Sequence, residues 1–187
     1  HHAGRDSGEG FCIFNDVAVA AQHLANEGKK VCVYDTDAHQ GNGTMEIFYE
    51  NPDVLFISLH QDPRTIYPGV GQVMEFGKGE GKGYTVNVPF PKKSNKTEYR
   101  YAIEEVVRPV VEQFSPDVLI RNGGSDPHHS DSLTDLELDM SGLKYLGGTA
   151  REMARESKAG HIDLMLSGYG ERVTEGWKAI TIGSLDL

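Results

Sequence analysis

Apolar and polar residues alternate along this chain with two different periods. Short apolar runs predict buried strands at about 31–35, 54–60, 84–88, 117–121 and 162–166. Between these runs, apolar residues recur at helical spacing and predict helices at about 14–26, 44–49, 97–114 and 141–156. Strands that alternate with helices predict a mostly parallel sheet covered on both faces. The predicted fold is therefore a three-layer α-β-α domain of the α/β class.

Turn and capping residues mark the limits of these elements. Gly28 follows the first predicted helix, where glycine is the usual terminator, and Ser141 is the expected N-cap of the last long helix. The segment 61–83, rich in Gly and Pro, is expected to be a long loop. Its glycine run at 77–83 lacks a phosphate-binding signature, so a flexible connection is predicted there. A final element is expected to begin around Trp177.

Three of the predicted strands end in polar side chains. The first runs into Asp35, Asp37 and His39, the fourth is followed by Asp126, and the fifth is followed by Tyr169. Because parallel strands bring their carboxyl ends to one edge of a sheet, these side chains are expected to converge. Two carboxylates and one imidazole suit a borderline divalent ion such as zinc and leave a position open for water. Loops rich in Asp and Gly are also common turns, which is the alternative for each motif taken alone.

The order of the motifs resembles that of the zinc-dependent histone deacetylase family, within the arginase and deacetylase superfamily. A terminal histidine pair can also be what a purification tag leaves, but the residues after the pair match the family. The matching blocks are His1-His2-Ala3, Phe11-Cys12, Asn15-Asp16, Asp35-Thr36-Asp37-Ala38-His39, Gly41-Asn42-Gly43-Thr44, the segments 56–60, 66–71 and 83–89, Gly124-Ser125-Asp126 and Ser167-Gly168-Tyr169. They cover essentially the whole chain, and the resemblance implies an arginase/deacetylase-like fold.

The resemblance also implies a role for each polar residue at the strand ends. Asp37, His39 and Asp126 look like the three ligands of a zinc ion. Tyr169 looks like the phenol that donates a hydrogen bond to the amide oxygen in the transition state.

A histidine pair would complete the catalytic set. His2 looks like the general base that takes a proton from the attacking water, and His1 looks like its electrostatic or acid partner. Asp35 is expected to accept a hydrogen bond from His1 and fix its tautomer. Asn42 stands where class I members carry an aspartate paired with the second histidine. A neutral amide raises the pKa of His2 less than a carboxylate would.

A narrow tunnel for the acyl-lysine stem is implied as well, formed by Gly10, Phe11, Tyr67 and, near the rim, Leu133. The family's inner potassium site would be formed by Asp35, Asp37, His39, Ser58 and Leu59. A second, outer monovalent site would lie near Phe48, Val54 and Tyr84.

Several residues depart from the commonest family pattern. Gln40 replaces a second histidine of many eukaryotic members and resembles class IV and its prokaryotic relatives. His128 and His129 are extra ligands, tunnel-mouth residues or part of a solvated loop, and the solvated loop is the prediction. Surface positions are expected for His23 and His161.

The chain is expected to form a single deacetylase-like domain over residues 1–187. The family's catalytic domain is longer, and its first strand and helices would precede His1. The sequence is therefore interpreted as a fragment that lacks the N-terminal portion, with a naturally short variant as the alternative.

Composition and charge limit the kinds of substrate, binding partner and cellular compartment that are expected. A formal net charge of −10 argues against direct binding of nucleic acid and suits cationic substrates such as lysine-rich segments or polyamines. Cys12 and Cys32 have no paired spacing, which favours a reducing, cytoplasmic compartment. No apolar run is long enough for a transmembrane helix, so no membrane association is expected. The oligomeric state is left open.

The predicted function is zinc-dependent hydrolysis of acyl groups from lysine side chains or from small acylated amines. An arginase-like hydrolase with two manganese ions is less favoured, because position 128 is a histidine rather than a further aspartate. A non-catalytic module that binds zinc and acyl-lysine is the alternative from another functional class. The sequence does not distinguish among substrates or acyl lengths.

Overall fold

The structure is a computed structural model that describes residues 1–187, and its strands and helices alternate along the chain. The strands are β1 (Val31–Asp35), β2 (Val54–Gln61), β3 (Thr85–Phe90), β4 (Val118–Gly123) and β5 (Gly160–Met165). The helices are α1 (Asp16–Asn26), α2 (Asn42–Phe48), α3 (Lys96–Ala102), α4 (Arg108–Phe114), α5 (Met140–Glu156) and α6 (Val173–Leu185). A π-helical turn, Ile103–Val107, joins α3 to α4, and a short 3-10 turn covers Gly79–Gly81.

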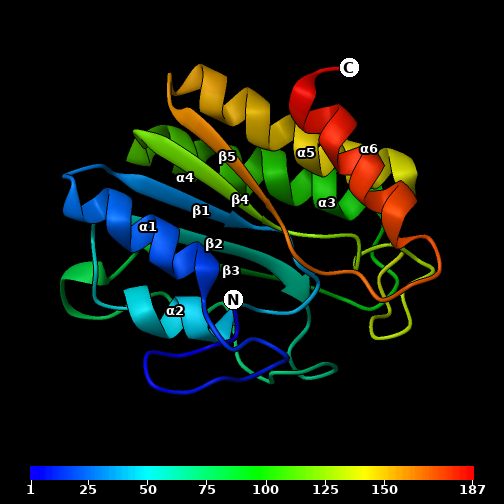
Figure 1. The fold of residues 1–187 in the computed structure, drawn as a ribbon, viewed down its shortest axis with the longest axis horizontal. Coiled ribbons are helices and arrows are strands. Elements are labelled where there is room, and N and C mark those ends of the chain that lie inside the picture. Colours follow the sequence, from blue (N-terminus) through cyan, green and yellow to red (C-terminus); the bar gives the residue numbers. More distant parts are fainter.

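The five strands form one parallel sheet in the order β3-β2-β1-β4-β5 (Figure 1). The chain therefore builds the sheet outward from β1, first through β2 and β3, and then on the other side through β4 and β5. The register places Asp35 of β1 beside Ser58 of β2 and Asn122 of β4. Open α/β sheets bind ligands where the strand order reverses, which here is between β1 and β4.

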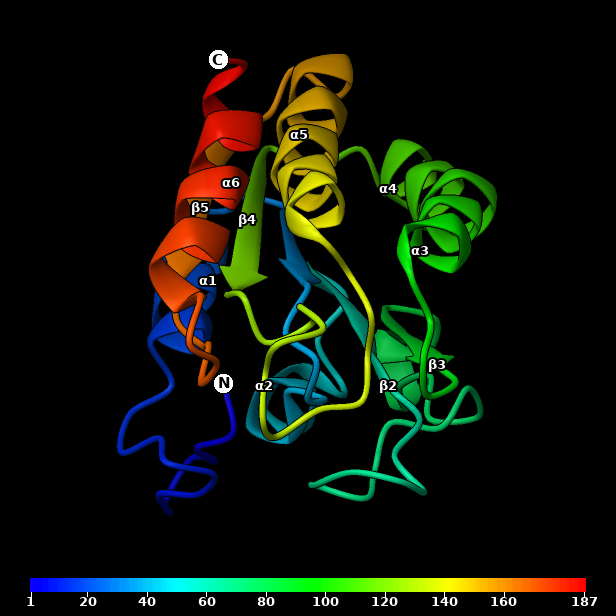
Figure 2. The same ribbon diagram turned by 90° about the vertical axis from the view of Figure 1, so that its right-hand side faces the viewer.

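Helices cover both faces of this sheet (Figure 2). Val31 and Val33 of β1 belong to a cluster of 10 buried residues that includes α1 and α2. Cys32 and Tyr34, which point to the opposite face, belong to a cluster of 22 buried residues shared with α3, α4, α5 and α6. Burial on both faces explains the apolar runs with which β1, β2 and β4 begin. The prediction of a three-layer α/β fold is confirmed.

The N-cap of α5 differs from the prediction. Asp139, and not Ser141, caps this helix, since the Asp139 side chain accepts a hydrogen bond from the Gly142 N–H at 2.8 Å. Ser141 lies in the first turn, where its hydroxyl donates to the same carboxylate at 2.8 Å. An aspartate two residues upstream thus competes successfully for the capping position.

The last helix starts earlier than the sequence suggests. Trp177 lies inside α6, which begins at Val173 and packs beside α5 (Figure 2). A side chain at Gly147 or Gly183 would overlap backbone of the opposing helix, so both glycines permit this close approach. Glycine lowers helix propensity, which is why the pattern conceals the length of α6. None of the helices combines the length and apolar character that a membrane span requires.

Candidate active site

Asp37, His39 and Asp126 meet at the ends of two adjacent strands. β1 ends at Asp35, so Asp37 and His39 lie in the loop after β1, and Asp126 lies in the loop after β4. One ligand atom from each residue lies within 4.8 Å of the others. His39 Nδ1 is 3.1 Å from both Asp37 Oδ1 and Asp126 Oδ2, and all three side chains are buried. The structure therefore brings the predicted ligand set together.

The chemistry of this triad fits a divalent cation. Burial and the charge of Asp37 raise the pKa of Asp126 to about 8. Burial disfavours a charge on His39, yet the hydrogen bonds to Asp126 and Asp37 raise its pKa to about 10. Two buried carboxylates in contact repel each other, and a positive charge between them relieves that repulsion. A nitrogen with carboxylate oxygens is a donor set that zinc accepts.

Neighbouring groups hold the two carboxylates in place. The Ser167 hydroxyl donates to Asp126 Oδ1 at 2.9 Å, and the His39 N–H donates to Asp37 Oδ1 at 2.8 Å. Such outer hydrogen bonds orient metal ligands in proteins. Ser167 follows β5. The loops after three neighbouring strands, β1, β4 and β5, therefore supply the triad and its supporting hydrogen bonds.

The two N-terminal histidines form a hydrogen-bonded pair beside the triad. His1 Nδ1 is 2.7 Å from Asp35 Oδ2, and His1 Nε2 is 3.1 Å from His2 Nε2. Burial opposes protonation of His1, but the charges of Asp35 and Asp37 raise its pKa to about 10. Burial and then the charge of His1 lower the pKa of His2 to about 4, against the hydrogen bond to Asn42. His2 is therefore the neutral member of the pair, able to accept a proton.

A cavity of about 570 Å³ opens above these groups. All four predicted tunnel residues line it, together with His2, His39, Thr65, Ile66 and Tyr169. The rings of Phe11 and Tyr169 have centroids 6.1 Å apart, and Tyr67 packs edge-on to His2 at 5.0 Å. Burial and the charges of Asp37 and Asp126 raise the pKa of Tyr169 to about 12, so its phenol remains a hydrogen-bond donor at neutral pH.

Phe11 reaches this cavity from a tight two-residue turn. Glu9 and Cys12 exchange backbone hydrogen bonds of 2.9 and 2.8 Å, and both central residues, Gly10 and Phe11, have positive φ angles of 53° and 66°. Positive φ at both central positions is the signature of a type I′ turn. A side chain at Gly10 would overlap the ring of His2, which explains the glycine. A bulky residue with positive φ is unusual, and such residues cluster at functional sites.

Known proteins are similar to this chain in sequence and in fold. The model of the histone deacetylase domain matches residues 1–183 of the chain. The chain belongs to the histone deacetylase family. Among its relatives it is 40% identical over 169 residues to a probable deacetylase of Archaeoglobus fulgidus, over 90% of this chain and 46% of that protein. It is 37% identical over 157 residues to the acetoin utilization protein AcuC of Bacillus subtilis, over 83% of this chain and 41% of that protein.

Solved structures of the family have the same fold. The HD domain of HDA15 superposes with a TM-score of 0.89 at 34% identity, covering 98% of this chain and 52% of that one. The acetylpolyamine aminohydrolase of Burkholderia pseudomallei superposes with a TM-score of 0.88 at 33% identity, covering 97% and 52%. The family resemblance and the arginase/deacetylase-like fold are thus confirmed, and archaeal and bacterial proteins are among the relatives. The chain spans about half the length of these proteins.

The residues expected around potassium also lie together, next to the triad. Asp35 and Ser58 are paired in the register of β1 and β2, and Leu59 follows Ser58. The Ser58 hydroxyl is 2.8 Å from His60 Nδ1. Of the residues expected at the outer site, Phe48 and Val54 share the smaller apolar cluster, whereas Tyr84 packs against the larger one. The side chains of the outer set are therefore divided between the two faces of the sheet.

The remaining histidines correct one prediction. His128 is buried and not part of a solvated loop, because the chain folds back after Asp126. The His128 N–H donates to the Ser125 carbonyl at 3.0 Å, and the His128 ring nitrogen Nδ1 accepts from the Ser130 N–H at 3.1 Å. His129 and His23 are exposed, as predicted, whereas His161 is half-buried and its predicted surface position holds only in part.

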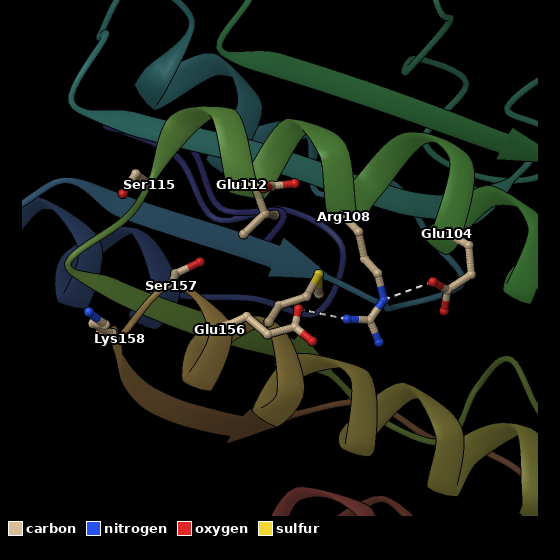
Figure 3. A pocket seen from close by; sticks show the side chains of 9 residues that line it. Glu104, Arg108, Glu112, Ser115, Glu156, Ser157 and Lys158 are labelled. Carbon is tan, nitrogen blue, oxygen red and sulfur yellow. Dashed lines mark hydrogen bonds and ion pairs between the residues drawn. The ribbon is translucent and has the colours of Figure 1, made fainter.

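A separate hollow of about 750 Å³ lies between α4 and α5 and contains none of the predicted site residues (Figure 3). Ser115 and Lys158 on its wall precede β4 and β5, so it lies at the opposite end of these strands from the triad. Arg108 in this hollow is held by Glu104, Glu152 and Glu156. These pairs neutralise the charge of Arg108. The residues that line the hollow include no group of metal-ligating side chains like Asp37, His39 and Asp126.

Two residues near the site carry no signal in the sequence. Asp131 accepts hydrogen bonds from the backbone N–H of Tyr169 at 2.7 Å and of Leu133 at 2.9 Å, and so links the Tyr169 backbone to the tunnel rim. Glu9 contacts Tyr67 and Asn42. Both are single acids in loops, where no periodicity or motif spacing distinguishes them from solvated surface residues.

Proposed function

We propose that this protein hydrolyses the amide bond of acylated amines, either acyl-lysine side chains or small acylated amines, at a zinc ion held by Asp37, His39 and Asp126. The observation that carries the proposal is the position of the buried triad. It lies beside an aromatic-walled cavity that His2, His39 and Tyr169 all line. Family membership supports a hydrolase, since the named relatives include deacetylases and an acetylpolyamine aminohydrolase.

The residues divide the chemistry among them. A bound zinc ion lowers the pKa of water and polarises a carbonyl. His2, with its pKa of about 4, is neutral at physiological pH and accepts a proton at Nε2. His1 stays protonated between Asp35 and His2 and stabilises developing negative charge. Tyr169 donates to the amide oxygen as it becomes an oxyanion, and His2 returns its proton to the leaving amine.

The substrate enters through the cavity walled by Phe11 and Tyr67, which suits a narrow aliphatic stem. The net charge of −10 favours an amine or a lysine-rich segment, not an anionic substrate. A potassium ion at Asp35, Asp37, His39, Ser58 and Leu59 would support the loop after β1. Both cysteines are free, which supports the cytoplasmic location that the sequence predicts.

The test combines metal content with turnover of a fluorogenic acetyl-lysine peptide and of an N-acetylated polyamine. About one zinc per chain with hydroxamate-sensitive hydrolysis of either substrate is the expected result. Zinc without hydrolysis of either substrate would instead favour a binding module. Absence of zinc from protein refolded with the metal would contradict the proposed ligand set.

A further inference from the structure

Glu9 joins two residues of the proposed site from a distant loop. Its Oε1 accepts hydrogen bonds from the Tyr67 hydroxyl at 2.6 Å and from Asn42 Nδ2 at 3.2 Å. Asn42 Oδ1 in turn lies 2.7 Å from His2 Nδ1. Glu9 is 33 residues from Asn42 and 58 from Tyr67, so only the folded chain assembles this line of contacts.

In this chain of hydrogen bonds, the donor and acceptor in one bond determine the donor and acceptor in the next. A carboxylate only accepts hydrogen bonds, so the part of the Asn42 amide that faces Glu9 is its NH2 group. The carbonyl oxygen of Asn42 then faces His2, and because a carbonyl also only accepts, His2 Nδ1 must carry a hydrogen. In neutral His2 the lone pair is then on Nε2, the atom 3.1 Å from His1 Nε2.

The opposite direction would disable His2 as a base. If the Asn42 amide were rotated, its NH2 would donate to His2 Nδ1 and the hydrogen of His2 would move to Nε2. The lone pair would then point toward Asn42, and the hydrogen on His2 Nε2 would face the Nε2–H of protonated His1. The rotated amide would also place its oxygen against the Glu9 carboxylate, two acceptors in contact.

We infer that Glu9 is a positioning residue, which orients the Asn42 amide and thereby holds His2, from the side opposite His1, in the tautomer with its lone pair on Nε2. The inference rests on the proposed function, in which His2 is the general base.

The local structure keeps Glu9 in place. Its backbone N–H and carbonyl both bond to Cys12 in the type I′ turn that also presents Phe11 to the cavity. Gly10, the next residue, lies against the His2 ring. Burial and the bond to Glu9 raise the pKa of Tyr67 above its ordinary range, so the phenol remains a donor to this carboxylate. The turn thus sets the position of Glu9 relative to Asn42 and His2 together.

The first experiment reads the tautomer without turnover. Heteronuclear NMR of nitrogen-labelled protein, with the His2 signals assigned from a His2→Gln variant, is expected to show hydrogen on Nδ1. Glu9→Ala should introduce the Nε2–H form. Glu9→Gln, whose amide oxygen can still accept from Asn42, should largely restore Nδ1–H. Asp6→Ala removes an exposed acid from the same segment and should leave the spectrum unchanged. An Nδ1–H tautomer that persists in Glu9→Ala would overturn the inference.

The second experiment uses the coupling between Glu9 and Asn42. Glu9→Ala should lower kcat roughly three- to tenfold, the size of one lost hydrogen bond, with little change in KM. In an Asn42→Asp background the same change should cause no fall, because a carboxylate at position 42 accepts from His2 in either orientation and loss of Glu9 removes the like charge beside it. An equal fall in both backgrounds would mean that Glu9 acts through its charge or through Tyr67, and would overturn the inference. Absence of any turnover in the unaltered protein would count against the proposed function, and the tautomer would still decide the role of Glu9.

Discussion

Tyr169 combines an accessible phenol with a fixed backbone. Its side chain is 46% exposed and lines the cavity, while its N–H donates to Asp131 at 2.7 Å. The hydroxyl is thus free to meet a substrate oxygen, whereas the position of the ring is set by the loop.

Replacing this hydroxyl tests the oxyanion role. Tyr169→Phe should lower kcat roughly 10²–10³-fold, as loss of one oxyanion donor typically does. Metal content should stay unchanged, because the ring and its backbone bond to Asp131 remain. Steady-state kinetics with metal analysis measure both quantities. Full activity in this variant would mean that another group stabilises the carbonyl oxygen.

His60 links stability to pH. Its Nδ1 is 2.8 Å from the Ser58 hydroxyl and its Nε2 is 2.9 Å from the Gly71 carbonyl. Burial lowers its pKa from 6.5 to about 4, so the unfolded chain binds this proton more readily than the folded protein does. Stability from this group is fully present above pH 6.5 and is lost as the pH falls toward 4.

His60→Gln should therefore flatten the acid side of the stability profile. The glutamine amide can still donate to Gly71, but it does not titrate. Between pH 7 and pH 5 the unaltered protein should lose roughly 2 kcal/mol more stability than the variant. Urea unfolding at the two pH values measures the difference. His128 and His161, whose pKa values are also lowered, are present in both proteins, so equal losses would assign the effect to them.

Single residues are where sequence reasoning is strongest and also where it fails. Asp37, His39 and Asp126 could be predicted to converge because each follows an apolar strand. The prediction of a solvated loop was wrong for His128. The residues after Asp126 are polar, and the sequence does not show that the chain folds back there and buries the histidine. Glu9 could not be found at all, since its partners Tyr67 and Asn42 are brought to it only by tertiary structure.

Among the elements, α5 offers a clear test of capping. Asp139→Ala removes the acceptor for the Gly142 N–H and should lower the free energy of unfolding by about 1 kcal/mol. Ser141→Ala leaves that bond intact and should cost less. Denaturant titration of the two variants ranks them. A larger loss for Ser141→Ala would favour the capping residue predicted from the sequence.

The predictability of an element follows from how it is buried. β1, β2 and β4 are covered on both faces, so continuous apolar runs predict them. β5 forms an edge of the sheet and is only half-buried, and its predicted start is two residues late, at 162 instead of Gly160. In α6, Gly176 lies in the first turn, where a side chain would overlap Ser125, and this glycine conceals the start of the helix.

At the scale of the whole molecule, the strand order explains the place of the site. β1 and β4 are neighbours in the sheet, although the chain leaves β1 in one direction and returns to β4 after completing β2 and β3. The loops after these two strands diverge and leave the space in which Asp37, His39 and Asp126 meet. The triad therefore joins segments from both halves of the sheet, and a cation bound there would link them.

Metal removal should consequently destabilise the entire fold. A ligand that binds only the folded state at 100 times its Kd stabilises it by about 2.7 kcal/mol. For a chain of this length, chelation of the cation should lower Tm by roughly 5–10 °C. Differential scanning calorimetry with and without chelator measures the shift. Asp126→Asn is the matched control, because it weakens the metal site itself: its Tm should respond little to chelator. A Tm that is insensitive to chelator in the zinc-loaded unaltered protein would mean that the triad does not join the two halves of the sheet through a metal.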